Sequence, residues 1–186
     1  MLQLILYLIL VFALLFFFIF MSVYGLSMIF SSAMGAPYVP TKNKLANEIL
    51  KEVKFKKNGL FVELGSGDAR IVRTAVKNFG VRGLAVDVNG LLILWSKILK
   101  FLDPRLRGDD KLAFETGNIL KTDLTKSDYI YLFLFPALIK KLLPKFDKEL
   151  KKGTIIISHG FEILEYKKKL IKKVPRNTFP TYYYKV

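Results

Sequence analysis

A glycine-containing turn with acidic residues on both sides is the part of this sequence best suited to chemistry. The turn and its flanks read Val62-Glu63-Leu64-Gly65-Ser66-Gly67-Asp68-Ala69-Arg70. Glycines between a strand and a helix allow the backbone to turn tightly and to approach a ligand. Asp87 ends the next apolar run, where a carboxylate can accept hydrogen bonds from both hydroxyls of a ribose. These residues predict a binding site for a nucleotide-like cofactor.

The details of the turn discriminate between cofactors. A dinucleotide fingerprint would place a third glycine at position 70, where this chain has Arg70. The small Ala69 instead fits the acidic-x-Gly-x-Gly-x-Gly/Ala pattern of class I S-adenosylmethionine-dependent methyltransferases, with Glu63 as the leading acid. That cofactor has no pyrophosphate to place on the helix N-terminus, so an arginine is compatible. A purely structural turn is the alternative, and the register of Glu63 with Asp87 argues against it.

Further candidate residues fall at the ends of later predicted strands. Asn118 follows the third strand, where these enzymes place Asp or Asn against the adenine amine. Phe135 and Pro136 close the fourth strand beside the expected position of the transferable methyl, although they also fit a plain hydrophobic strand end. His159 ends the fifth strand and could orient or deprotonate a nucleophile. A packing or helix-capping role is the alternative for this histidine.

The elements that would position these residues alternate between strand and helix. Apolar periodicity predicts strands over residues 59–64, 83–88, 111–116, 128–135, 153–158 and 181–186. It predicts helices over residues 42–53, 68–79 and 91–101, and another after the fourth strand through Leu143. This alternation predicts an α/β fold with a Rossmann-like, largely parallel sheet and helices on both faces. Residues 103–110 are polar and predict a surface loop without a site.

The N-terminal segment predicts a membrane anchor. Leu4–Met21 is an unbroken run of 18 apolar residues, and residues 2–27 are long enough to cross a bilayer once. A buried core helix is seldom apolar on every face, and a cleaved signal peptide would carry a basic residue before the run. We therefore expect a transmembrane anchor at residues 1–30, a proline-containing linker at 31–41 and a catalytic domain at 42–186.

The charge distribution predicts the orientation of this anchor. Residues 1–41 contain no Lys, Arg, Asp or Glu, so the net charge of +15 belongs to residues 42–186. Lysines directly after the span favour a single-pass membrane protein whose C-terminal domain is cytoplasmic. These lysines could touch anionic headgroups or form an ordinary solvated helix face. With no cysteine and one histidine, thiolate and histidine-cluster metal sites are excluded, and no metal is expected.

Taken together, these features resemble membrane-associated protein-lysine methyltransferases related to those acting on the ATP synthase c subunit and mitochondrial adenine nucleotide carriers. The match comprises the anchor, residues 36–41, Glu63–Val72, Asp87, the strand ending at Pro136, and residues 153–161. The resemblance implies an S-adenosyl-L-methionine site formed by Glu63, Gly65, Ser66, Gly67, Asp87 and Asn118. It also implies that the segment before the domain closes over cofactor and substrate, which makes Tyr38 and Thr41 candidates. Ala69 replaces the family's usual glycine, and residues 103–110 lengthen the loop that leads toward Asn118.

The anchor and the resemblance together predict methyl transfer to a lysine of a membrane protein. RNA methylation is an alternative that would suit the net charge through phosphate attraction. However, the basic runs Lys140-Lys141 and Lys167-Lys168-Lys169 carry no interleaved aromatic residues, so nucleic acid is not the expected partner. A non-catalytic nucleotide- or lipid-binding membrane module is a third reading. The combination of Glu63, Asp87 and Asn118 argues against it.

Overall fold

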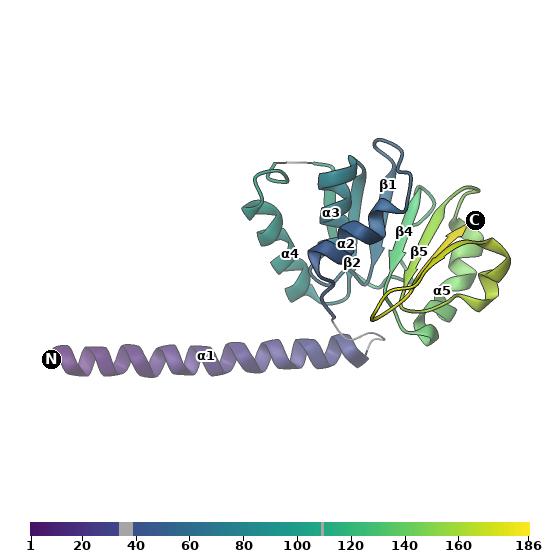
Figure 1. Ribbon diagram of the computed structural model, residues 1–186. Coiled ribbons are helices and arrows are strands. Elements are labelled where there is room, and N and C mark those ends of the chain that lie inside the picture. Colours follow the sequence, from purple (N-terminus) through teal and green to yellow (C-terminus); the bar gives the residue numbers. More distant parts are fainter. Residues whose placement is uncertain (34–38, 109) are drawn as a thin grey trace.

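The computed structural model describes residues 1–33, 39–108 and 110–186, in which one long helix precedes an α/β domain (Figure 1). The strands are β1 (Leu60–Leu64), β2 (Arg82–Asp87), β3 (Leu112–Thr116), β4 (Tyr129–Leu132), β5 (Ile155–His159), β6 (Leu170–Val174) and β7 (Thr181–Lys185). The helices are α1 (Leu2–Ala33), α2 (Asn43–Lys51), α3 (Arg70–Phe79), α4 (Gly90–Leu102) and α5 (Pro136–Glu149), with a 3₁₀ helix η1 (Leu164–Lys169).

All seven strands form one sheet in the order β3-β2-β1-β4-β5-β7-β6. Strands β1 to β5 run parallel, and β7 pairs antiparallel with both β5 and β6. The chain moves outward from β1 to β3 and then returns to place β4 on the other side of β1. Such a switch leaves a crevice at the carboxyl ends of the central strands, where ligands bind in open α/β sheets. The predicted Rossmann-like class I methyltransferase sheet is confirmed.

Side chains of β1 alternate between two hydrophobic layers. Phe61 packs in the layer that contains buried residues of α2 and α3, and Val62 packs in the layer that contains the buried face of α5. Helices therefore cover both faces of the sheet, as predicted. Gly83 in β2 permits the close approach of α3, because a Cβ atom there would lie 2.5 Å from a methyl group of Val72.

Two predicted features of the domain differ from the structure. Strand β4 ends at Leu132 rather than at residue 135, because Pro136 already begins α5, a position where the fixed φ of proline suits a helix. Strand β6 was not predicted. Its sequence contains two lysines and its pattern is mostly exposed, which is typical of an edge strand and hides the usual apolar signal. Lys167-Lys168-Lys169 lies in η1.

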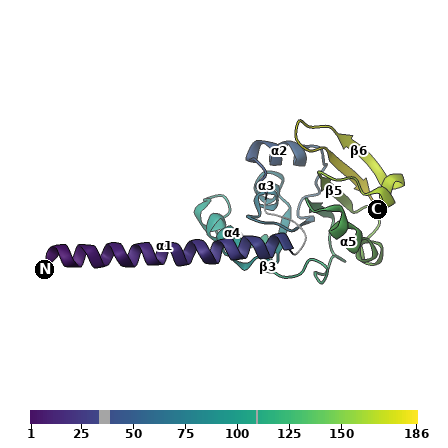
Figure 2. The ribbon, with the colours of Figure 1, turned by 90° about the horizontal axis from the view of Figure 1, so that it is seen from below.

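Helix α1 extends away from the domain (Figures 1 and 2). Residues 2–29 of this helix are long and apolar enough to cross a membrane, and the side chains of that segment's most apolar window are not buried. Near its C-terminal end, Ser27 Oγ donates a 2.8 Å hydrogen bond to Asn89 Oδ1, and Asn89 Nδ2 donates to the Ser27 carbonyl at 3.2 Å. This contact fixes the end of α1 beside the N-terminus of α4.

Candidate functional site

A cavity of about 260 Å³ lies at the carboxyl ends of the central strands. All six residues predicted to bind the cofactor line it: Glu63, Gly65, Ser66, Gly67, Asp87 and Asn118. The structure thus brings together residues that are up to 55 positions apart in the sequence, because they end or follow neighbouring parallel strands. Their contacts with a cofactor remain a prediction.

The glycine turn takes a backbone path that requires residues without side chains. Gly65 and Gly67 have φ values of +72° and +54°. A Cβ atom on Gly65 would lie 2.8 Å from the side chain of Leu134 across the cavity wall. Ala69 also adopts a left-handed conformation, with φ of +56°. That conformation strains a residue with a Cβ atom, so the alanine that replaces the family's usual glycine stands at a position suited to glycine.

Asp87 links the end of β2 to this turn. Its Oδ2 accepts a 2.7 Å hydrogen bond from the Gly67 amide, and its Oδ1 accepts a 2.8 Å bond from the Asn89 amide. Burial raises the pKa of Asp87 above its ordinary value, while the two amide donors act in the opposite direction. Each carboxylate oxygen can accept a second hydrogen bond. The same group can therefore hold the turn and bind the hydroxyls of a ribose.

Glu63 lies on the cavity wall but also has a structural partner. Its Oε2 accepts a 2.9 Å hydrogen bond from the Val72 amide in the first turn of α3. Burial raises the pKa of Glu63 well above its ordinary value, and the nearby carboxylates of Asp68 and Asp87 act in the same direction. The leading acid of the motif therefore joins β1 to α3 and sets where the helix begins relative to the cavity.

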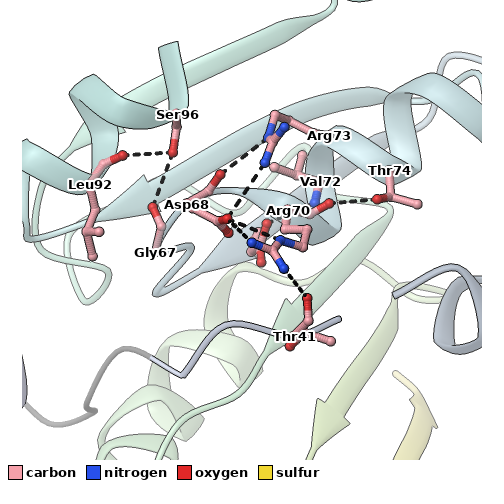
Figure 3. A network of polar contacts seen from close by, with 10 residues as sticks. Thr41, Gly67, Asp68, Arg70, Val72, Arg73, Thr74, Leu92 and Ser96 are labelled. Carbon is pink, nitrogen blue, oxygen red and sulfur yellow. Dashed lines mark hydrogen bonds and ion pairs between the residues drawn. The ribbon is translucent and has the colours of Figure 1, made fainter. Parts of the chain in front are cut away.

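A polar network connects the glycine turn to the segment before the domain (Figure 3). Arg70 donates from Nε and Nη2 to Asp68 Oδ2 at 3.1 and 2.7 Å, and from Nη1 to the carbonyl of Thr41 at 2.9 Å. Arg73 Nη2 lies 3.8 Å from the same carboxylate oxygen of Asp68. Val39, Pro40 and Thr41 all line the cavity. The pre-domain segment therefore forms one wall of the site, held by Arg70.

Two buried hydroxyl groups on the cavity wall lack hydrogen-bond partners within the described part of the chain. They are Ser66 Oγ and Tyr131 Oη. Burial, followed by the charge of Glu63, raises the pKa of Tyr131 well above its ordinary range. The Thr41 side chain is close enough to oppose that effect without reaching hydrogen-bond geometry. Buried polar groups are normally paired, so these hydroxyls are suited to a bound ligand, and they fit a polar cofactor and its substrate.

The remaining predicted residues have different positions. Asn118 is exposed at the cavity wall, and its Oδ1 accepts a hydrogen bond of 2.9 Å from the Leu120 amide. Phe135 and Pro136 are exposed at the start of α5 and do not line the cavity. His159 is buried behind the wall, where Nδ1 lies 2.9 Å from Thr181 Oγ1 and the ring packs on Phe133. Tyr38 lies outside the described residues.

Several wall residues were not identified from the sequence. Phe133, Leu134 and Leu138 line the cavity where Phe135 and Pro136 were expected, because β4 ends earlier than predicted. Tyr131 was read as part of a buried strand. In the parallel ladder it stands opposite Glu63. That register, combined with the alternation of side chains along a strand, is the signal that could have placed both on the face toward the cavity.

Comparison with known proteins agrees with this geometry. A family model described as the ANTKMT methyltransferase domain matches residues 63–169. A protein-lysine N-methyltransferase of Saccharolobus islandicus is 32% identical over 139 residues, which cover 74% of this chain and 84% of that protein. A lysine N-methyltransferase of the ATP synthase c subunit from Caenorhabditis elegans is 30% identical over 135 residues, covering 69% of this chain and 68% of the relative.

A solved structure has the same fold. It is an RNA methyltransferase from Salinibacter ruber in complex with S-adenosyl-L-homocysteine, with a TM-score of 0.71 and 24% identity. The similarity covers 80% of this chain and 94% of the other. At this identity the likeness concerns the fold alone.

Proposed function

Since this chain belongs to the ANTKMT methyltransferase family and uses S-adenosylmethionine, we propose that it methylates a lysine of a membrane protein. In this proposal α1 anchors the enzyme and the domain lies on the cytoplasmic side. The observation that carries the proposal is the contact between Ser27 of α1 and Asn89. Asn89 follows Asp87 by two residues, and Asp87 lines the cavity. The site thus lies beside the end of the candidate membrane span.

The names of the relatives support the choice of substrate. The archaeal relative is a protein-lysine methyltransferase, and the nematode relative is one for the ATP synthase c subunit. The net charge of +15 would repel a soluble cationic tail. A lone lysine at the bilayer surface meets less repulsion than a chain of basic residues. We therefore favour a membrane-embedded protein with a lysine near its cytoplasmic surface.

The walls of the cavity suit attack by a neutral amine. The bound cofactor supplies a methyl group on a positively charged sulfur, which is already a good electrophile. Phe133, Leu134 and Leu138 give the cavity an apolar side. Transfer of a lysine to such a surface lowers its pKa, because burial disfavours the charged form. The amine nitrogen then bonds to the methyl carbon as the carbon–sulfur bond breaks, and the nitrogen afterwards loses a proton to water.

This chain's contribution to the reaction is mainly positioning and exclusion of water. The Gly65–Gly67 turn and Asp87 would hold the nucleoside part of the cofactor, and the segment Val39–Thr41 would close the site from the side of α1. Tyr131 is the candidate to orient the incoming amine, since its buried hydroxyl has no partner among the described residues. A dedicated base is not required when the amine enters deprotonated.

Labelling of membranes tests the substrate. Membranes from a strain that lacks the enzyme are incubated with the purified full-length chain and cofactor carrying a radioactive methyl group. We expect label in a membrane-protein band, with methyl-lysine located by mass spectrometry, and no label with the Asp87→Ala variant. Label only in RNA, or only in soluble proteins, would contradict the proposal.

Protease protection tests the orientation. The full-length chain is placed in sealed vesicles whose cytoplasmic face is inside. Protease added outside should leave the domain intact until detergent opens the vesicles. Digestion of the domain in sealed vesicles would reverse the proposed topology.

A further inference from the structure

Helix α4 has two apolar faces, only one of which packs against the domain. Leu92 and Ile93 are buried against the sheet side. The opposite face is formed by large apolar residues that are 39–64% exposed: Leu91, Leu94, Trp95, Ile98, Phe101 and Leu102. Their spacing of three, four and seven residues places them on one stripe of the helix. We call this set the α4 apolar face.

A continuous stripe of this kind differs from the isolated apolar residues on the rest of the domain. Other exposed large apolar side chains, such as Phe135, Leu164 and Ile171, come from separate elements. Single exposed apolar residues are normal on a protein surface, whereas a contiguous patch marks an interaction site. The α4 apolar face therefore has an occupant that is not part of the domain.

The position of α4 identifies that occupant. In Figures 1 and 2 α4 forms the edge of the domain nearest to the N-terminal part of α1, and in Figure 1 it runs across the direction of α1. The hydrogen bonds between Ser27 and Asn89 lie immediately before the first residue of α4. When α1 crosses a bilayer, this edge of the domain meets the bilayer surface, with α4 lying in its plane.

The residues around the stripe have the chemistry of a membrane interface. Trp95 is the type of residue that concentrates at the boundary between headgroups and acyl chains. Lys97 is exposed on α4, and Arg105 and Arg107 are exposed in the loop that follows. The Arg107 guanidinium lies 5.0 Å from the centre of the Phe101 ring, so a cation sits directly against the apolar face. Basic residues beside an apolar stripe favour anionic lipid surfaces.

We propose that α4 is an interfacial helix whose apolar face inserts into the surface of the bilayer that α1 crosses. The inference rests on the anchoring part of the proposed function. It adds a second attachment point, which prevents the domain from rotating about the end of α1. Asp87 is separated from α4 by two residues, so the same attachment fixes the cofactor-binding end of β2 at a constant height above the membrane.

The fluorescence of Trp95 tests this proposal directly, because the sequence contains one tryptophan. The full-length chain is reconstituted into vesicles of phosphatidylcholine and phosphatidylglycerol, with and without bromine on the acyl chains near the headgroup. We expect brominated lipid to remove most of the Trp95 emission, and we expect aqueous acrylamide to quench it poorly.

Two double variants separate insertion from anchoring. Leu94→Glu with Ile98→Glu should keep the chain in the vesicles through α1 but restore emission in brominated lipid and quenching by acrylamide. Leu164→Glu with Ile171→Glu removes two equally exposed apolar residues from η1 and β6 and should change neither signal. Cofactor affinity should be the same in all three proteins, which verifies that they are folded.

The outcomes distinguish this inference from the proposed function. A chain that remains with the vesicles after an alkaline wash, while Trp95 is insensitive to brominated lipid, would overturn the interfacial role of α4 and leave the anchor intact. Protection of Trp95 from both quenchers would indicate a protein contact and would also overturn it. A chain released from the vesicles by the wash would overturn the anchor and this inference together.

Discussion

Arg70 and Thr41 are joined by a 2.9 Å hydrogen bond from the guanidinium Nη1 to the backbone carbonyl. The remaining donors of Arg70 bind Asp68, whose side chain is almost fully buried. A residue of the glycine motif thereby holds the segment that precedes the domain. Since Thr41 also lines the cavity, this contact relates closure of the site to the motif that would bind the cofactor.

Removal of this contact should weaken cofactor binding. In Arg70→Ala the wall formed by Val39–Thr41 loses its attachment, and we expect the dissociation constant for S-adenosylhomocysteine to rise about three- to tenfold, as for a partly exposed charge-assisted hydrogen bond. Titration calorimetry measures the change. Arg73→Ala is the matched control, because Arg73 contacts Asp68 and is not bonded to Thr41. Equal losses in both variants would mean that Arg70 acts through Asp68 alone.

Substitution of Asp87 should affect the cofactor more strongly. Asp87→Ala removes the acceptors for the ribose and for the Gly67 amide, so affinity should decrease by at least about tenfold. The control Asp103→Ala loses an ion pair with Lys77 outside the cavity and should bind normally. Because burial raises the pKa of Asp87, acidification should weaken binding at a higher pH than an ordinary aspartate would require. Unchanged affinity in Asp87→Ala would refute the assignment.

The unpaired hydroxyl of Tyr131 predicts opposite effects on activity and stability. Tyr131→Phe removes a buried polar group that has no partner among the described residues, so the melting temperature should stay the same or rise. Methyl transfer should decrease about tenfold if that hydroxyl orients the amine. Tyr183→Phe provides the contrast, because it removes a 3.0 Å hydrogen bond to the Ile49 carbonyl and should cost about 1 kcal/mol of stability while activity persists. Full activity in Tyr131→Phe would exclude the proposed role.

His159 should make the stability of the domain dependent on pH. Burial, with a contribution from Arg176, lowers its pKa to about 4, whereas an unfolded histidine titrates near pH 6.5. Between these values the unfolded chain binds more protons, so stability should fall as the pH decreases from about 6.5 towards 4, by at most about 3 kcal/mol. Melting curves at several pH values would measure this. His159→Gln should flatten the dependence in this window, and a persistent slope would assign it to other groups.

The sequence by itself determined the elements that carry local signals. The glycine turn, the carboxylate at Asp87 and the alternation of strands and helices were predicted because tight turns, apolar runs and helical periodicity depend on neighbouring residues. Parallel strands place their carboxyl ends together, so Glu63 and Asp87 could be assigned to one site before any coordinates. Strand β6 escaped because an edge strand with lysines lacks the apolar pattern of a buried one.

The tertiary structure decided which side chains reach the cavity. Tyr131 reaches it through its register opposite Glu63, whereas His159, although it ends a neighbouring strand, is held behind the wall by Thr181 and Phe133. Thr41 becomes part of the site through Arg70, which is 29 positions away in the sequence. Such contacts depend on long-range packing, which local patterns do not encode.

Helix α4 illustrates the same division. Its sequence, Gly90-Leu91-Leu92-Ile93-Leu94-Trp95-Ser96-Lys97-Ile98-Leu99-Lys100-Phe101-Leu102, is apolar around much of its circumference, so a helix is predicted without indicating which side is buried. Packing against the sheet selects the side with Leu92 and Ile93 and leaves the other side exposed. Only the position of that exposed side relative to α1 relates it to a membrane, because the helical period describes one helix and not its neighbours.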